Sequence, residues 1–388
     1  MELKKIHISD IGKIVTGKTP RTSVAENYDG YIPFLTPSDD LSHKSAPKTT
    51  KTLTEQGLNE VRNCLLPSRS ICVSCIGSDL GKVVMTKEPT VTNQQFNSII
   101  PNKNFNADFV YYFMTLVGRE LNYLSKTSTA VPIINKSSFS NYEIEVPDLE
   151  TQNRIASILS SIDSKIELNR RINDNLEQQA QALFDHYFDS GSIYLEDSIM
   201  GCLTDIAVYL NGLAMQKFPA TDIERSLPVL KIKELGQRKC DDCSDRCSDS
   251  IDADYIIDNE DIIFSWSGTL MVDVWCGGKC GLNQHLFKVT PLKNYPRWFV
   301  YYWTNRHLKK FKLIAKDKAV TMGHIRRGDL ENAEVAIPTN LNMLEINARI
   351  NPLFQSIIDR RLEITKLENI RDALLPKLMS GELTINEI

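Results

Sequence analysis

Residues Gly12 to Thr19 match the spacing of a phosphate-binding loop, in which backbone amides cradle the phosphates of a nucleotide. A working loop of this kind leaves a buried apolar strand and opens directly into a helix. Here residues 4–10 are half polar, and the residues after Thr19 have the composition of a loop. The sequence therefore argues against nucleotide hydrolysis. Lys18 and Arg21 remain candidates for contacts to the phosphates of a nucleic acid.

Two further groups of residues imitate catalytic sites. Asp148 with Asp163 and Lys165 resembles the acidic pair and lysine that hold magnesium in many nucleases. Those sites are built on adjacent strands, whereas Asp163 and Lys165 stand inside a helical pattern. Residues 351–354, Asn-Pro-Leu-Phe, resemble the Asn-Pro-Pro-aromatic loop of amino methyltransferases, but they also fall in a helical pattern and no glycine-rich cofactor loop accompanies them. We therefore predict a chain without a catalytic site and without a cofactor.

The chain contains nine cysteines, an odd number that favours reduced thiols over a disulfide framework. Five of them gather in the second half of the chain: Cys240, Cys243, Cys247, Cys276 and Cys280. Their spacing is irregular for a zinc ribbon, and neighbouring aspartates raise the energetic cost of gathering thiolates there. We expect ordinary reduced cysteines and no metal, with a zinc or iron-sulfur site as the alternative.

The second half of the chain also separates its charges. Residues 241–261 include nine acidic residues and one basic residue, whereas residues 293–327 include ten basic residues and one acidic residue. Lysine and arginine neutralise DNA phosphates and dominate affinity. The candidate phosphate contacts in this basic run are Lys309, Lys310, Lys312, Arg326 and Arg327, accompanied by Arg306, Lys316 and Lys318. Trp298, Tyr301, Tyr302 and Trp303 have helical spacing, which favours a place in the core over stacking on bases.

Two polar triplets are candidates for reading the base sequence of DNA. They are Asn93-Gln94-Gln95 and Asn283-Gln284-His285. Amide and imidazole groups can donate and accept hydrogen bonds at base edges in the major groove. The same side chains can instead cap or brace a turn of the backbone. Both interpretations stay open at the level of the sequence.

The two halves of the chain follow one plan. Residues 32–35, Ile-Pro-Phe-Leu, correspond to residues 227–230, Leu-Pro-Val-Leu. The motif Phe-Val-Tyr-Tyr occurs at both 109–112 and 299–302. The two polar triplets and the prolines at 147 and 338 complete a set of four landmarks in the same order. Matched landmarks in one order predict an internal repeat.

A helical pattern follows each of these prolines. Apolar residues alternate in steps of three and four, which is the seam of a coiled coil, and the second seam repeats the first at a constant offset of 191 residues. A seam of about 40 residues needs a partner, so we expect the two helices to pair with each other as an antiparallel coiled coil. Asn169, Asn173, Arg360 and Arg371 interrupt the seam, either to fix its register or where it faces water. The expected interface residues are Ile155, Leu159, Ile162, Ile166, Leu176, Leu183, Ile346, Ile350, Leu353, Ile357, Leu367 and Leu374.

The chain has 388 residues, which is too long for one ordinary hydrophobic core. Its 42% hydrophobic and 24% charged residues exclude disordered and collagen-like classes. No apolar stretch reaches the roughly 18 residues of a membrane helix and the N-terminus is polar, so we expect a cytoplasmic protein that does not enter a membrane. Short apolar runs between Gly, Pro, Asn and Asp predict α+β globular domains at 1–147 and 191–338. Long helices are predicted at 148–190 and, with a short tail, at 339–388.

This arrangement resembles the specificity subunit of type I restriction-modification systems over essentially the whole chain. The most specific marks are residues 370–383 at the end of the second helix and the stretch Asp261-Ile262-Ile263-Phe264-Ser265-Trp266-Ser267-Gly268-Thr269-Leu270. The segments around the polar triplets, and Gly17-Lys18-Thr19-Pro20, are also similar to the family pattern. The cysteine cluster is not a mark of that family.

The resemblance implies a non-catalytic reader of double-stranded DNA with two target-recognition domains and a pseudo-two-fold repeat. Each domain would read one half of a split, asymmetric target, and the paired helices would set the unread gap. The helices would also dock two modification subunits and, through them, restriction subunits, which bind the methyl donor and ATP. A coiled-coil interaction scaffold that does not read DNA is the alternative. The target bases do not follow from the sequence, because base readout depends on side-chain placement.

Overall fold

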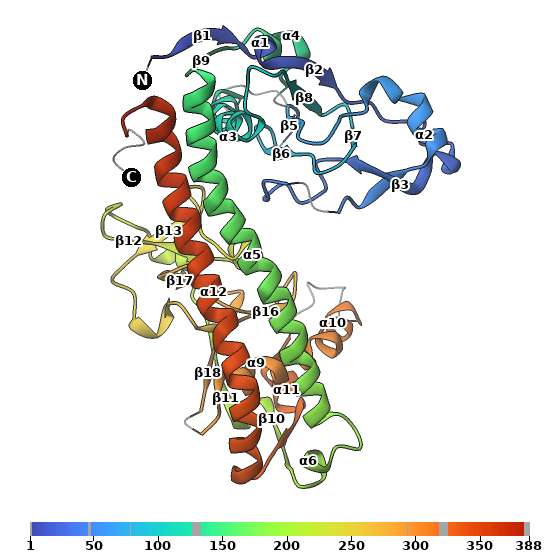
Figure 1. The fold of residues 1–388 in the computed structure, drawn as a ribbon. Helices are drawn as coiled ribbons and strands as arrows, with labels where there is room; N and C mark the ends of the chain where they lie inside the picture. The colour runs from blue at the N-terminus through green and yellow to red at the C-terminus, as the bar shows by residue number, and fades with distance from the viewer. Residues whose placement is uncertain are drawn as a thin grey trace. The chain divides into compact units, whose positions relative to one another are not determined.

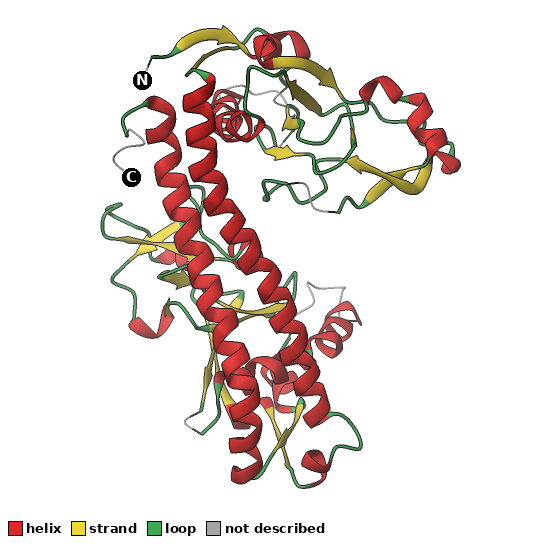
Figure 2. Cartoon of the chain, in the orientation of Figure 1, coloured by secondary structure: helices red, strands yellow, loops and turns green. Residues whose placement is uncertain are grey.

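The computed structural model describes residues 2–45, 48–77, 79–125, 133–292, 294–317 and 325–383. Two α+β segments alternate along the chain with two long helices, as the sequence predicts (Figures 1 and 2). The chain divides into two compact units. Unit 1 comprises residues 1–165 and 367–388, and unit 2 comprises residues 166–366, so each unit holds one α+β segment and part of both helices. None of the described helices is long and apolar enough to cross a membrane.

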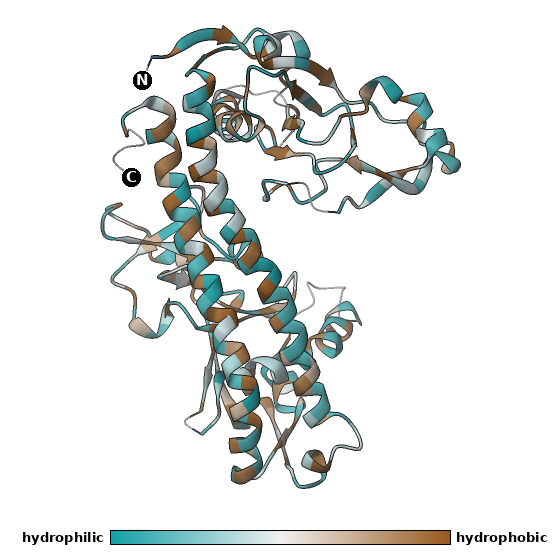
Figure 3. Cartoon of the chain, in the orientation of Figure 1, coloured by the Kyte–Doolittle hydropathy of each residue, from teal (hydrophilic) through white to brown (hydrophobic). Residues whose placement is uncertain are grey.

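The two long helices are α5, Leu149–Phe188, and α12, Asn340–Ser380. In unit 1, Arg371 donates a hydrogen bond to Asp163 over 2.9 Å. In unit 2, Asn173 donates to the carbonyl oxygen of Ile357 over 3.4 Å. Partners therefore move towards the N-terminus of α12 as the chain advances along α5, which is the antiparallel pairing that the seam predicts. Apolar residues recur along both helices between polar ones (Figure 3).

The predicted seam residues are buried or half-buried throughout the helix pair. Those that are buried are Ile155, Leu159, Ile166, Ile346, Ile350 and Ile357. Those that are half-buried are Ile162, Leu176, Leu183, Leu353, Leu367 and Leu374. The polar seam residues lie inside the pair as well. Asn169 is fully buried, donates to Glu363 over 2.8 Å and accepts from Arg360 over 3.2 Å.

The α+β part of unit 1 contains two main sheets and a short pair of strands. The antiparallel sheet has the order β2, β8, β5, β6, and the second sheet has the order β4, β3, β7. Their bounds are Gly12–Thr16, Phe96–Pro101, Ile71–Ser74 and Val83–Met85, then Lys51–Leu53, Tyr28–Leu35 and Val91–Thr92. Strands β1, Lys4–His7, and β9, Glu143–Val146, form the pair. The helices are α1, Ile8–Ile11, α2, Glu55–Glu60, α3, Ala107–Ser125, and α4, Lys136–Ser140.

Unit 2 repeats the strand order of unit 1 with one additional short strand, which confirms the internal repeat. Its sheets have the orders β11, β18, β15, β16 and β13, β12, β17, β14. Their bounds are Ala207–Asn211, Leu286–Pro291, Ile262–Ser265 and Met271–Val274, then Arg246–Ser248, Ser226–Leu230, Cys280–Leu282 and Ile256–Ile257. Strands β10, Ile199–Cys202, and β19, Glu334–Ile337, form the short pair. The helices are α6, Ile193–Glu196, α7, Leu203–Ile206, α8, Ile232–Gln237, α9, Arg297–Arg306, α10, Leu308–Asp317, and α11, Arg327–Glu331.

The main core of each unit is completed by both long helices. In unit 1, Ile155 of α5 and Leu378 of α12 belong to the cluster that contains Ile71 and Phe109. In unit 2, Phe184 and Ile350 of the same two helices belong to the cluster of Trp298 and Phe264. The aromatic residues of the basic run are therefore core residues: Trp298, Tyr302 and Trp303 are buried, and Tyr301 packs against Phe354.

The interior of unit 2 holds one buried ionic network. The guanidinium of Arg361, which is 8% exposed, donates to Asp273 over 2.5 Å and to Glu177 over 2.7 Å. Arg238 donates to the other oxygen of Asp273 over 2.7 Å. The strand pairing of unit 1 places Val84 at the position of Asp273, so the network belongs to unit 2 and is not part of the repeat.

We expect Asp273→Val to lower the free energy of unfolding by about 3 kcal/mol, because it leaves the buried Arg361 without its main counter-charge. Adding Arg361→Met should recover part of that loss, since the double variant leaves no uncompensated buried charge. Urea denaturation at neutral pH measures both values. A double variant that is as unstable as the sum of the two single variants would contradict this account of the network.

Candidate nucleic-acid interface

The first five residues of the segment that resembles a phosphate-binding loop, Gly12–Thr16, form strand β2, which pairs with β8 over its whole length. Gly17 follows this strand, and a Cβ atom there would lie 2.1 Å from the carbonyl oxygen of Asn93. Gly212 has the same place in unit 2, where a Cβ atom would lie 2.3 Å from the carbonyl oxygen of Asn283. The glycine therefore allows close approach of two backbones, which is a structural role and not phosphate binding.

The two polar triplets form equivalent turns, which we call reader loop 1, residues 93–95, and reader loop 2, residues 283–285. Asn93 and Asn283 are buried, and each accepts a hydrogen bond from the backbone two residues later, over 3.1 and 3.2 Å. The backbone nitrogens of Asn93 and Asn283 donate to the carbonyl oxygens of Leu35 and Leu230. Both asparagines thus brace their turns, so the structure gives them the bracing role that the sequence left open.

The other members of the reader loops face outward to a greater degree. Gln94 is exposed and its carbonyl accepts a hydrogen bond from Thr19 over 2.7 Å. Gln95, Gln284 and His285 are half-buried. His285 shares a 3.1 Å hydrogen bond with Ser267 through Nδ1, and its Nε2 lies 3.3 Å from Gln284. These side chains keep donors and acceptors at the surface on rigidly braced backbones.

An open cleft of about 610 Å³ lies beside reader loop 2. Reader loop 2 lines it together with five further polar residues: Gln216, Lys231, Lys233, Asp245 and Arg246. Lys231 pairs with Asp245, and Arg246 donates to Ser226 over 2.7 Å, so two of the cations are held in place. These residues were not predicted from the sequence, because Lys231 follows β12 and Arg246 belongs to β13, and only the pairing of these strands brings them together.

The basic run lies elsewhere in unit 2. Lys309, Lys310, Lys312 and Lys316 are exposed on α10, whose Phe311 is buried in the core. Figure 1 shows α10 on one side of the paired helices and β12, β13 and β17 on the other, so the structure does not bring these lysines to the cleft. Arg306 contacts Asp185 and Asp189. Arg326 and Arg327 are exposed at the start of α11, and Lys318 lies outside the described residues.

In unit 1 the two predicted phosphate contacts differ from each other. Lys18 is exposed, and its backbone nitrogen donates to Thr92 beside reader loop 1. The guanidinium of Arg21 donates twice to Glu60, over 2.6 and 2.9 Å. The hydrogen bonds and charge of Arg21 lower the pKa of Glu60 to about 2. Arg21 thus already has a carboxylate partner, while Lys18 stands next to the reader loop.

Most of the five cysteines that gather in the second half of the sequence lie in the interior of unit 2. Cys247, Cys276 and Cys280 are buried, and Cys240 packs against the cluster that contains Cys280. Burial raises the pKa of the Cys276 thiol to about 11, so it is protonated at neutral pH. Across the part of the chain that the structure describes, no three metal-binding side chains form a group suited to a metal ion.

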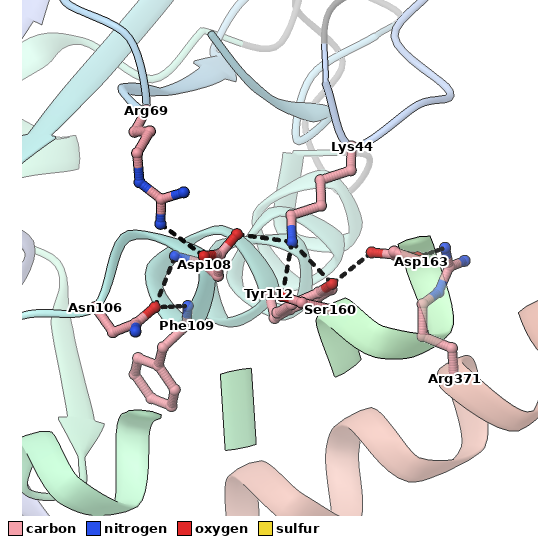
Figure 4. Close-up of polar contacts among 9 residues, drawn as sticks. All are labelled: Lys44, Arg69, Asn106, Asp108, Phe109, Tyr112, Ser160, Asp163 and Arg371. Carbon is pink, nitrogen blue, oxygen red and sulfur yellow. Dashed lines mark hydrogen bonds and ion pairs between the residues drawn. The ribbon is translucent and has the colours of Figure 1, made fainter. Parts of the chain in front are cut away.

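A polar cluster that the sequence analysis did not identify ties a loop of unit 1 to both long helices (Figure 4). The ammonium of Lys44 lies 2.8 Å from Asp108 and donates to Tyr112 over 3.0 Å and to Ser160 over 3.1 Å. Tyr112 in turn donates to Asp163 of α5 over 2.5 Å, and Arg371 of α12 donates to the same carboxylate.

Charge and burial hold this polar cluster in one protonation state. Burial disfavours the charged form of Asp108, but the hydrogen bonds from Lys44 and Arg69 lower its pKa below the usual value. Burial and the negative charge of Asp163 raise the pKa of Tyr112, so its hydroxyl stays protonated and remains a donor. In unit 2 the equivalent layer is apolar: Tyr302 packs on Phe354 and Phe184, with ring centroids 6.1 and 5.3 Å away.

Comparison with known proteins identifies the family of this chain. The family described as "Type I restriction modification DNA specificity domain" matches the chain twice, over residues 1–178 and 200–371. The chain belongs to this family. The prediction of a non-catalytic specificity subunit of a type I restriction-modification system is thereby confirmed, and the chain is a DNA specificity protein.

Individual relatives agree with the family match. The chain is 28% identical over 414 aligned residues to the MjaIX specificity subunit of Methanocaldococcus jannaschii, covering 100% of this chain and 94% of that protein. It is 35% identical over 173 residues to the HindI specificity subunit of Haemophilus influenzae, covering 43% and 38%. The S subunit of M. genitalium has the same fold, with a TM-score of 0.54 at 16% identity over 98% of this chain and 96% of that one.

We expect Gly212→Ala to lower the affinity of the specificity protein for its target DNA, the sequence that it selects from random duplexes, by about ten-fold. That loss is comparable to the effect of one mismatched base pair. The new methyl group would lie 2.3 Å from the carbonyl oxygen of Asn283, so it must push reader loop 2 away from the end of β11. Gly236→Ala on α8 is the matched control, because its nearest neighbour, Cε of Met271, would lie 3.6 Å away. Equal affinities of both variants in a titration would contradict the positioning role of Gly212.

Proposed function

We propose that this specificity protein recognises a bipartite, asymmetric DNA sequence, with one half read by each α+β domain. The domains correspond to residues 1–147 and 191–338. The observation that carries the proposal is the pair of equivalent reader loops, each braced by a buried asparagine in the same turn. Because the loops differ in their outward side chains, with Gln95 in one and His285 in the other, the two half-sites should differ in sequence.

The cleft beside reader loop 2 supports a role in base readout. Its cations, Lys231, Lys233 and Arg246, can neutralise phosphates, while Gln284 and His285 offer groups that bind base edges. Asp245 can accept a hydrogen bond from the amino group of cytosine. The separate lysines of α10 would then add sequence-independent affinity, since lysine contacts to phosphates position DNA but do not specify its sequence.

We further propose that the long helices dock two modification subunits and, through them, restriction subunits. The family match supports this part of the proposal, because a specificity protein without a catalytic site must pass its recognition to an enzyme. The alternative is an interaction scaffold that keeps the coiled coil and does not read DNA. The hydrogen bond between the polar seam residues Asn169 and Arg360 suits either function.

The test is selection by the full-length chain from a library of random duplex DNA, followed by sequencing of the bound fraction. We expect two short motifs at a fixed spacing, with binding that weakens steeply as salt rises because phosphate contacts release counterions. Replacing Gln284 and His285 together by alanine should degrade one motif and leave the other intact. Absence of binding at low salt would favour the scaffold, and binding without enrichment would contradict sequence recognition.

We also expect the spacing between the motifs to follow the length of the helix pair. Seven residues that continue the seam, inserted after both Asn169 and Arg360, keep the contacting helices in phase and lengthen each by about 10.5 Å. The spacing should then grow by about three base pairs, each of about 3.4 Å. The same selection experiment measures the spacing. Unchanged motifs at an unchanged spacing in a folded variant would show that the helices do not set it.

A further inference from the structure

The segment that joins β3 to β4 in unit 1 begins next to reader loop 1. Leu35, the last residue of β3, pairs with Thr92 and accepts a hydrogen bond from the backbone nitrogen of Asn93 over 3.1 Å. The structure describes residues 36–45 of this connection, which we call the 36–45 segment. It therefore leaves the sheet at the place where the candidate DNA-reading surface of unit 1 starts.

A buried carboxylate fixes the start of the 36–45 segment. Asp39, which is 6% exposed, accepts from the backbone nitrogen of Thr36 and from that of Thr50, both over 2.8 Å. Burial disfavours the charge of Asp39, but these backbone and side-chain hydrogen bonds lower its pKa below the usual value. Further along, the backbone nitrogen of Met85 on β6 donates to the carbonyl oxygen of Lys44 over 2.7 Å.

Between these two anchors the segment presents polar side chains in a fixed arrangement. Ser38, Asp40 and Ser42 are exposed, while Leu41 between them is buried in the core. One oxygen of Asp40 accepts from Ser42 through both its backbone nitrogen and its hydroxyl, over 2.8 and 2.6 Å. The other oxygen lies 3.0 Å from Nε2 of His43. Carboxylate, hydroxyl and imidazole groups are able to read base edges, and here they are preorganised.

We propose that the 36–45 segment is a second base-reading element of unit 1, held in place by Lys44 as a positioning residue. The inference rests on the proposed function. Lys44 fixes the end of the segment to three side chains, those of Asp108 and Tyr112 on α3 and of Ser160 on α5 (Figure 4). Its ammonium also lies 4.4 Å from the centroid of the Tyr112 ring, which adds a cation-π contact.

The effect of Lys44 should be confined to one half-site. In unit 2 the residue that follows the equivalent strand is Lys231, which lines the cleft and pairs with Asp245. At the positions of Asp108 and Asp163, unit 2 has Trp298 and Phe354, which offer no carboxylate to an ammonium. The anchor is therefore a feature of unit 1 and not of the repeat.

The experiment repeats the selection from random duplex DNA with the full-length variants Lys44→Met and Asp40→Ala. In the wild type a mismatched base pair should weaken binding by about 5-fold to 150-fold, and in both variants the penalty at the affected positions of one motif should fall below about 3-fold. The other motif should keep its full information content. Lys44→Arg should restore the first motif, because a guanidinium can still donate to Asp108 and Ser160.

Arg69→Met is the matched control. Arg69 donates to Asp108 over 2.6 Å but does not belong to the 36–45 segment, so its loss should leave both motifs intact. An unchanged first motif in Lys44→Met, or equal decay of both motifs, would overturn the positioning role. An unchanged motif in Asp40→Ala, where Lys44→Met changes it, would overturn the reading role. Failure of the wild type to select any motif would instead refute the proposed function itself.

Discussion

The burial of the helix seam is the constraint on which the rest of the structure depends. A helix of 40 residues with an apolar stripe along its length cannot be stable in water alone. Here the stripe is divided between two cores, because each unit takes residues from both helices. Unit 1 needs Leu375 and Leu378 from near the C-terminus to complete the core around Phe109. Its contacts therefore join residues that are far apart in the sequence, which makes their closure entropically costly.

Because the two helices repeat one seam, they could pair in more than one register, and the polar residues in the seam help to select one of them. Both helices carry the same seam, so many pairings would bury similar apolar area. In unit 1 the layer of Asp163 and Arg371 is ionic, and in unit 2 the equivalent layer of Phe354 and Ala180 is apolar. Mispairing would place a buried charge opposite an apolar side chain, at a cost of several kcal/mol for each unpaired ion. The asymmetry of the repeat thus favours one antiparallel arrangement.

The candidate DNA-reading surface depends on this scaffold through backbone contacts more than through side chains. In both units a glycine lets a strand end approach the reader loop, and an asparagine closes the turn. Those positions are the same in the two repeats, whereas Gln95 and His285, or Lys18 and Leu213, differ. A constant backbone with variable outward residues is the arrangement expected when two related domains read different sequences.

The sequence by itself determined the repeat, the two long helices and the α+β class, because the spacing of apolar residues and the matched motifs can be recognised in a single sequence. It also singled out the two polar triplets, which form equivalent turns in the structure. It could not decide whether the Asn93 side chain reads bases or braces a turn, since only the folded turn brings its oxygen to the backbone nitrogen of Gln95. Only the tertiary structure brought Lys231 and Arg246 to one cleft, separated the lysines of α10 from it, and joined Lys44 to Asp108 and Ser160. These contacts link residues tens to hundreds of positions apart, and no periodicity encodes such pairs.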